Sequence, residues 1–141
     1  MNREKYYILV LHSRSICVSA EGVTPLPQKV DAIRRIPAPT SIKELQRYLG
    51  ALNYYRRFIP HVAAILSPLY EVLRGKPKKL QWTDTCEDAF KKSKEALANA
   101  TMLVHPVDGA PLALTVDASV VAIGGVLEQH VGGHWQPLGF F

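Results

Sequence analysis

The sequence is poor in cysteine and has no long apolar run, and these two absences exclude several classes of protein. Its 141 residues include two cysteines, Cys17 and Cys86, too few for a disulfide framework and without the CxxC spacing of zinc sites. No run of 18 apolar residues is present, so the sequence predicts neither a membrane span nor a membrane partner. The apolar run at residues 6–11 is shorter than the apolar core of a signal peptide. We therefore expect an intracellular chain with reduced cysteines.

Positive charge is absent from the last third of the chain. All 17 Lys and Arg lie in residues 1–95 together with nine acids, whereas residues 96–141 contain three acids and no Lys or Arg. The first part therefore carries a net charge of +8 and the second a net charge of −3. Such an asymmetry indicates a part that faces a polyanion, joined to a part with another role. A basic helical surface that contacts only solvent is the alternative.

Apolar residues at helical spacing, with capping and proline signals, predict four helices at residues 26–35, 41–59, 62–73 and 83–97. Ser41 and Glu44 form a capping box at the start of the second helix, in which each side chain satisfies a free backbone amide. Pro60 ends this helix, and Pro68 can kink or split the next one. We assign Lys94 to the solvent-exposed face of the fourth helix.

The pattern changes to period two after residue 106. Leu112, Leu114 and Val116 alternate with smaller or polar residues, which predicts a strand. Residues 121–129 predict a second strand, the Gly132-Gly133 pair a hairpin turn, and residues 134–141 a third strand. The expected fold class is α+β: an N-terminal helical segment, then a further helix and an incomplete, antiparallel three-stranded meander.

Several motifs in residues 18–141 carry a family resemblance. They read VSAEGV at 18–23, LGALNYYRRFIP at 49–60, TVDAS at 115–119 and IGGVLEQ at 123–129. In this order they resemble the thumb and the first ribonuclease H-like strands of gypsy-type LTR retrotransposon reverse transcriptases. The resemblance implies a thumb-like helical region at 18–75 and a ribonuclease H-like domain at 76–141, truncated at its C-terminus. Residues 1–17 are atypical, because SRSI stands at 13–16 where the family usually has Phe-Leu-Gly-His.

The resemblance implies a parent that is an RNA-directed DNA polymerase and also hydrolyses RNA–DNA hybrids with Mg²⁺. The polymerase site uses an Asp-Asp pair, and this chain contains none. Asp117 matches the first of about four carboxylates that hold two metal ions in the ribonuclease H site. Asp108 falls in a turn with Gly109, and Glu128 is not a family ligand. We therefore expect Asp117 to be a catalytic metal ligand only in an intact parent, and this chain to need no cofactor and to be inactive.

Basic residues on or beside the first two predicted helices are the candidate nucleic-acid-binding residues. The resemblance implies that they face an RNA–DNA or DNA duplex, which they would bind weakly and without sequence preference through its phosphates. Tyr54 and Tyr55 could stack on sugars or bases, although Tyr55 falls on the apolar stripe. The candidate cations are Arg34, Arg35, Lys43, Arg47, Arg56 and Arg57.

Three other interpretations of this sequence stay open. A domesticated remnant could bind protein through the open sheet edge, and the same edge could cause self-association. A true two-metal nuclease would need three more carboxylates near Asp117. His130 and His134 could form an imidazole pair across the Gly132-Gly133 hairpin, although no third metal ligand is evident.

Overall fold

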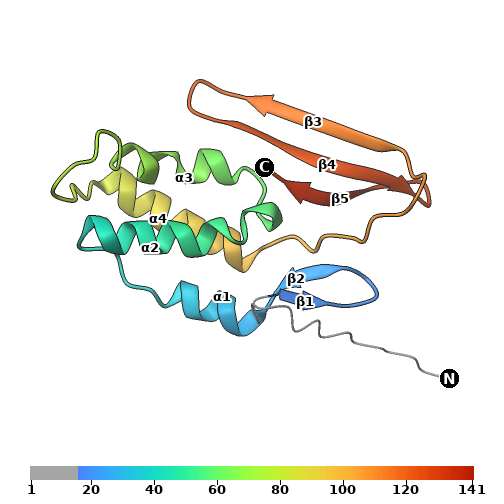
Figure 1. The fold of residues 1–141 in the computed structure, drawn as a ribbon, viewed down its shortest axis with the longest axis horizontal. Coiled ribbons are helices and arrows are strands. Elements are labelled where there is room, and N and C mark those ends of the chain that lie inside the picture. Colours follow the sequence, from blue (N-terminus) through green and yellow to red (C-terminus); the bar gives the residue numbers. More distant parts are fainter. Residues whose placement is uncertain (1–15) are drawn as a thin grey trace.

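The computed structural model describes residues 16–141 as a helical region joined to a three-stranded sheet (Figure 1). The expected α+β fold class is confirmed. The apolar run at residues 6–11 and most of the atypical segment 1–17 lie outside the described residues. The elements in chain order are β1 (Ile16–Val18), β2 (Val23–Pro25), α1 (Pro27–Arg34), α2 (Ile42–Asn53), the 3₁₀ turn η1 (Arg56–Phe58), α3 (Val62–Glu71), α4 (Asp84–Ala98), β3 (Leu112–Ala118), β4 (Ile123–Val131) and β5 (His134–Phe140).

The helix starts follow the capping signals of the sequence. The Ser41 Oγ accepts a hydrogen bond from the Glu44 backbone N–H at 3.2 Å. The Glu44 carboxylate accepts from the Thr40 N–H at 2.7 Å, so it satisfies the amide before Ser41 rather than that of Ser41 itself. At α4, the Thr83 Oγ1 accepts from the Cys86 N–H at 3.3 Å. These bonds fix where α2 and α4 begin.

The structure corrects the predicted end of the second helix. α2 ends at Asn53, six residues earlier than expected, and the chain continues through η1. Ile59 precedes Pro60 and is extended, with φ −117° and ψ 109°, because the proline ring disfavours the helical conformation before it. The turn also brings Phe58 and Ile59 into the core, where a straight helix could not place them together. Pro68 lies inside α3, which remains one element.

Lys94 also departs from its expected position. It is only partly exposed, its ammonium donates to the Ile36 carbonyl, and it lies 4.2 Å from the centre of the Phe90 ring. Burial lowers the pKa of Lys94 from its usual value. The side chain therefore ties α4 to the segment between α1 and α2 instead of pointing into solvent.

The hydrophobic core lies between the helices. Tyr48 of α2 and Phe90 of α4 pack at 4.6 Å between ring centres, and the buried Tyr48 and Ser93 hydroxyls are hydrogen bonded. Burial raises the pKa of Tyr48. Within residues 16–141 no helix is both long and apolar enough to cross a bilayer. The fully buried apolar side chains include Leu45, Tyr48, Leu52, Phe58, Ile59, Val62, Leu66, Leu69 and Leu97.

The predicted meander is confirmed, with strand order β3-β4-β5 and antiparallel pairing throughout. Gly132 and Gly133 have φ values of 61° and 81°, which the tight β4–β5 turn requires. One register shift lies between Leu127 and Glu128. The β1–β2 hairpin was not predicted. Gly22 at its turn packs so closely on Leu103 that an added Cβ would stand 2.2 Å from the Leu103 carbonyl oxygen.

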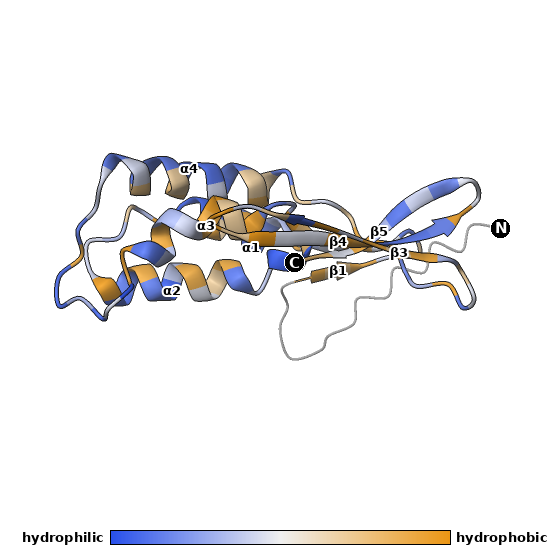
Figure 2. Ribbon diagram, turned by 90° about the horizontal axis from the view of Figure 1, so that it is seen from above, coloured by the Kyte–Doolittle hydropathy of each residue, from blue (hydrophilic) through white to orange (hydrophobic). Residues whose placement is uncertain are grey.

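Two polar side chains attach the sheet and the hairpin to the connector at residues 99–111. Gln129 is buried; its amide donates to the His105 carbonyl and its Oε1 accepts from the Val107 N–H, both at 2.9 Å. The His105 ring nitrogen Nε2 lies 2.7 Å from the Ser19 carbonyl oxygen. Figure 2 shows that the sheet strands have apolar (orange) stretches and hydrophilic (blue) ones, the latter toward the β4–β5 turn. The sheet keeps large apolar side chains exposed, among them Leu112, Leu114, Val116 and Ile123.

Candidate nucleic-acid interface

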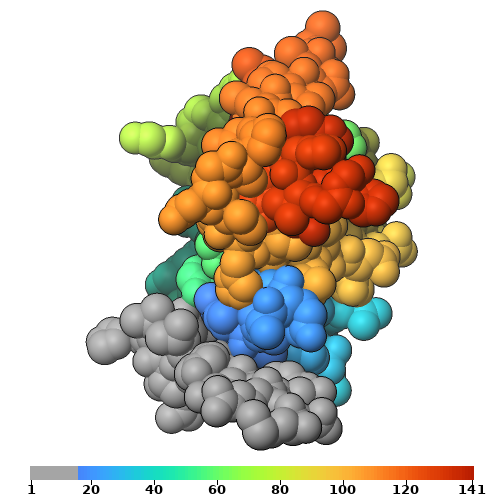
Figure 3. All heavy atoms as spheres, turned by 90° about the vertical axis from the view of Figure 1, so that its right-hand side faces the viewer, coloured from blue at the N-terminus to red at the C-terminus, as the bar shows by residue number. Residues whose placement is uncertain are grey.

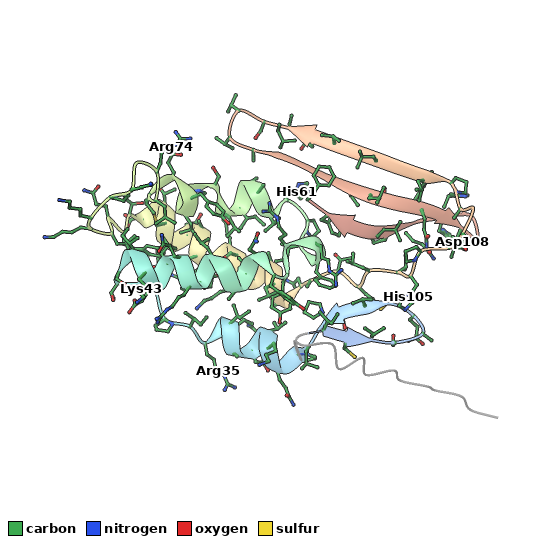
Figure 4. The ribbon with its side chains drawn as sticks, in the orientation of Figure 1. Arg35, Lys43, His61, Arg74, His105 and Asp108 are labelled. Atoms are coloured by element: carbon green, nitrogen blue, oxygen red, sulfur yellow. The ribbon has the colours of Figure 1, made fainter. Side chains whose placement is uncertain are left out.

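The exposed face of α2 gathers basic, small and aromatic residues in one line. Leu45, Tyr48, Leu49 and Leu52 are buried, so they define the inner face of the helix. On the opposite face Lys43, Arg47, Gly50 and Tyr54 follow one another at spacings of three or four residues. We call these four residues the α2 stripe. It extends over about 16 Å at 1.5 Å per residue, and Figure 4 shows Lys43 at one end of it.

Gly50 has no packing reason among the residues that the structure describes. It lies in the middle of α2, is exposed, and a Cβ added there would meet nothing within 4 Å. Glycine in a helix interior costs roughly 0.5–1 kcal/mol relative to alanine. Gly50 therefore lowers the stability of α2 slightly, and it leaves the helix backbone exposed between Arg47 and Tyr54. Such a position suits the close approach of another molecule.

The electrostatic surroundings of the stripe are dominated by positive charge. Glu44 is the one acid of α2. Hydrogen bonds from the Thr40 backbone and hydroxyl, with a smaller contribution from the charge of Arg47, lower the pKa of Glu44. The Glu44 carboxylate thus accepts hydrogen bonds from Thr40 at the start of the helix. The ion pairs among residues 16–141 are Arg74–Glu71, Lys91–Glu87 and Lys92–Asp88, and none of them lies on the stripe.

The structure brings some of the predicted cations together and separates others. Arg56 donates to the Asn53 side-chain carbonyl at 3.1 Å, which places it at the C-terminal end of the stripe. The Arg57 guanidinium lies 4.9 Å from the centre of the Phe58 ring. Arg34 instead lines a depression with Asp31 and residues of α4, and Arg35 points away from α2 in Figure 4. Lys43, Arg47 and Arg56 are therefore spread along α2, from its first turn to just beyond its end.

A groove of about 320 Å³ separates α1 from α2 beside the stripe. It is lined by Lys29, Ile33, Ile36, Ala51, Tyr54 and others. Tyr54 is 47% exposed and stands edge-on to Tyr55, which is only 3% exposed. Tyr55 is therefore a core residue, as its place on the apolar stripe suggested. Lys29 and Gly50 were not among the candidate residues predicted from the sequence. A glycine inside a strong helical pattern was the available signal for the second.

Asp117 lies at a second, separate location. It is exposed near the end of β3 and lines a small pocket of about 120 Å³ with His61, Thr115, Phe140 and others. Within residues 16–141 no group of three or more His, Cys, Asp or Glu side chains could hold a metal ion. Glu128 pairs with Ala113, about 14 Å along the strand from Asp117. The described residues therefore do not fit a pair of magnesium ions.

The suggested imidazole pair does not form. His130 is opposite Trp135 and packs edge-on against its ring at 5.0 Å, whereas His134 is opposite Val131. Successive residues of a strand point to opposite faces of the sheet. The hairpin register therefore separates the two histidines.

A known protein family matches the three-stranded sheet and the helix before it. Residues 82–141 match the family described as the RNase H-like domain found in reverse transcriptase. This match covers 60 of the 141 residues. The RNase H-like region thus includes α4 and the whole β3-β4-β5 sheet, and it contains Asp117 but none of the cations of the stripe.

Two curated relatives extend the likeness into the helical region. The chain is 38% identical over 133 residues to the retrovirus-related Pol polyprotein from transposon opus of Drosophila melanogaster, covering 87% of this chain and 13% of that protein. It is 34% identical over 125 residues to the transposon Tf2-3 polyprotein of Schizosaccharomyces pombe, covering 88% of this chain and 9% of that protein. The predicted resemblance to retrotransposon reverse transcriptases is confirmed. The chain corresponds to a small segment of such Pol polyproteins.

Two solved structures share the fold. One is described as the foamy viral protease-reverse transcriptase dRH in complex with ds DNA, with a TM-score of 0.77, 23% identity, and coverage of 100% of this chain and 24% of that chain. The other is the foamy viral protease-reverse transcriptase in complex with dsDNA, with a TM-score of 0.75, 25% identity, and coverage of 90% and 26%. The helical region and the RNase H-like region therefore occur together in known reverse transcriptases. The domain boundary at 75/76 stays a prediction.

Proposed function

We propose that the α2 stripe, with Arg56 at its end, binds the sugar–phosphate backbone of a nucleic-acid duplex. The observation that carries this proposal is Gly50, which lies exposed between the cations and Tyr54 on one helix face and where an added Cβ would meet none of the described residues. This open position lets a phosphodiester strand approach the helix backbone closely. Lys43 and Arg47 lie on one side of it and Tyr54 on the other.

The chemistry of the stripe suits backbone contact rather than sequence readout. Lysine and arginine neutralise phosphates and release counterions, which favours binding without sequence preference. Tyr54 is exposed enough for its ring to pack on a sugar or base. If Lys43, Arg47 and Arg56 each neutralise one phosphate, log K should fall against log salt with a slope of about −3. Binding by this chain alone is therefore weak and sensitive to salt.

A solved relative supports the choice of ligand. The foamy viral protease-reverse transcriptase that is 25% identical to this chain is described in complex with dsDNA. The charge distribution agrees with it, because the net positive charge lies in the helical part and residues 96–141 are net negative. A duplex would thus be attracted to the helices and repelled by the sheet.

The binding test compares two charge reversals on exposed helical surfaces. Arg47→Glu lies on the stripe, and Lys91→Glu lies on the outer face of α4. Fluorescence anisotropy with an RNA–DNA hybrid and a DNA duplex at several salt concentrations should show weaker binding and a slope reduced by about one unit for Arg47→Glu alone. Equal losses for both variants would contradict the assignment of the stripe.

We further propose that this chain by itself cleaves no nucleic acid. Polymerisation and Mg²⁺-dependent hydrolysis of RNA–DNA hybrids are assigned only to an intact parent protein. The reason is the number of ligands: Asp117 supplies one carboxylate, and two metal ions need several. Incubation with a labelled RNA–DNA hybrid and Mg²⁺ or Mn²⁺ should give no cleavage above a chelator control. Metal-dependent cleavage that is lost in Asp117→Asn would refute this proposal.

A further inference from the structure

The loop between α3 and α4 carries four cations within six residues. Lys76, Lys78 and Lys79 follow one another closely, and Arg74 comes just before them. All four side chains are exposed. Residues 72–83 contain no Asp or Glu, so no acid within this stretch offsets their charge. We call residues 74–79 the basic loop.

The three lysines of the basic loop have no acidic partner among residues 16–141. The ion pairs there are Arg74–Glu71 at 3.1 Å and two pairs on the outer face of α4, so Arg74 is neutralised and the lysines are not. A lysine ammonium is rarely buried without a partner. The basic loop therefore faces either solvent or a polyanion.

The backbone of the basic loop is anchored at both ends. Leu73 before it, and Leu80 and Trp82 after it, pack against the helical core. Lys76 has a φ of 52°, a left-handed conformation that is uncommon for residues other than glycine, asparagine and aspartate. Pro77 then fixes the next φ angle. The lysine at position 76 occupies a strained position, which points to a use for its charge.

The basic loop lies at the same end of the molecule as the start of the α2 stripe. Figure 1 places the α3–α4 loop and the N-terminal end of α2 at one end, and Figure 4 shows Arg74 and Lys43 there. Figure 3 shows the β1–β2 hairpin and the strands of the sheet at the opposite end. Residues 16–25 and 96–141 contain no Lys or Arg. Positive charge is therefore concentrated toward the end that holds the basic loop.

We propose that the basic loop binds the phosphate backbone of the same duplex as the α2 stripe, one stretch further along. This inference rests on the proposed function of the stripe. A duplex that follows the stripe and extends past Lys43 reaches this end of the molecule, where Lys76, Lys78 and Lys79 neutralise additional phosphates. Such contacts release counterions and add to the salt dependence without adding sequence preference.

Duplex length separates the two contacts. A hairpin stem of about 6 base pairs covers about 20 Å at 3.4 Å per base pair, which is little more than the length of the stripe. A duplex of about 20 base pairs covers about 70 Å and extends well past it. The parent chain should therefore bind the long duplex with a steeper fall of log K against log salt than the short stem.

Fluorescence anisotropy of full-chain variants at several salt concentrations tests the basic loop. Lys78→Glu/Lys79→Glu should weaken binding of the long duplex about tenfold at low salt and reduce the slope by about two, with a much smaller effect on the short stem. Lys91→Glu/Lys92→Glu is the matched control, because it makes the same change of charge on lysines that already pair with acids. This control should leave the slope unchanged.

Two further variants make the result decisive. Lys78→Gln/Lys79→Gln removes the two charges without adding acids, so it should give the same reduction in slope with a smaller loss of affinity. Equal losses for the loop variant and the α4 control, or an unchanged slope for the loop variant, would overturn this inference. Arg47→Glu should weaken binding of both duplex lengths. A loss with Arg47→Glu and none with the loop variant would refute the loop alone, and the reverse result would refute the stripe.

Discussion

The helical region and the sheet use similar apolar residues with opposite results. In the helices, Leu45, Leu52 and Leu66 are almost completely buried, whereas Leu112 and Leu114 of the sheet are more than half exposed. Helices can cover one another within a short chain segment, but a sheet needs a separate layer on its face. Apolar content alone therefore does not define a core. The helical region is expected to be the stable part and the sheet the adaptable part.

The same two regions also differ in charge, and this separates their proposed roles. The helical part holds the cations that suit a polyanion, while residues 96–141 have three acids and no Lys or Arg. A duplex would therefore contact the helices rather than the sheet.

The largest expected effect is a contrast between two leucine truncations. Leu52→Ala should lower the free energy of unfolding by about 3 kcal/mol, since a buried leucine leaves a cavity. Leu114→Ala removes the same atoms from an exposed position and should cost less than about 0.5 kcal/mol in dilute, monomeric protein. Urea unfolding of both variants measures the difference. Equal losses would mean that the face of the sheet is covered in solution.

A second expected effect concerns the attachment of the sheet. Gln129→Ala should cost about 1–3 kcal/mol, because it leaves the Val107 N–H and the His105 carbonyl without their partner. Hydrogen exchange should accelerate in residues 105–131 and change little in α2. Gln28→Ala on the exposed side of α1 is the control for loss of an amide side chain. Faster exchange in α2 than in the sheet would contradict the division into two regions.

Local signals in the sequence predicted most of the elements. The Ser41 and Thr83 caps, the alternation in β3 and the Gly132-Gly133 turn each act within a few residues, so a single sequence shows them. Contacts between distant residues could not be predicted in the same way. Lys94 reaches Ile36 across 58 positions, and Gln129 reaches His105 across 24.

In the candidate site, too, local signals could be read from the sequence, whereas contacts between distant residues could not. Lys43 and Arg47 could be placed on one face from helical spacing alone. Arg34 and Arg35 are equally basic, but their orientation depends on how α1 packs beside α2 and α4, which the sequence does not show. The open space beside Gly50 could not be predicted from the sequence either, because it depends on how the other described elements pack around α2.

A smaller effect links stability and binding at the stripe. Gly50→Leu should raise the free energy of unfolding by about 0.5 kcal/mol, because leucine is a better helix former and meets no neighbour there. The same side chain would occupy the space that the duplex needs, so the affinity for duplex should fall. Gly50→Ala should show the gain in stability with a smaller loss of affinity. Unchanged duplex binding by Gly50→Leu would separate Gly50 from the proposed interface.

The smallest effect is a pH dependence that belongs to the helical region. The Thr40 amide and hydroxyl hold the pKa of Glu44 below its ordinary value, so the ionised carboxylate stabilises the start of α2. For a carboxyl whose pKa is lower in the folded state, the stabilisation is present above the unfolded-state pKa and is lost as the pH falls through the folded-state pKa. Glu44→Gln should therefore be less stable than the parent chain near neutral pH, and this difference should shrink as the pH falls below about 4. Urea midpoints at several pH values measure it, with Glu95→Gln on the exposed face of α4 as the control. A difference that stays constant down to low pH would show that the Glu44 carboxylate acts through its shape rather than its charge.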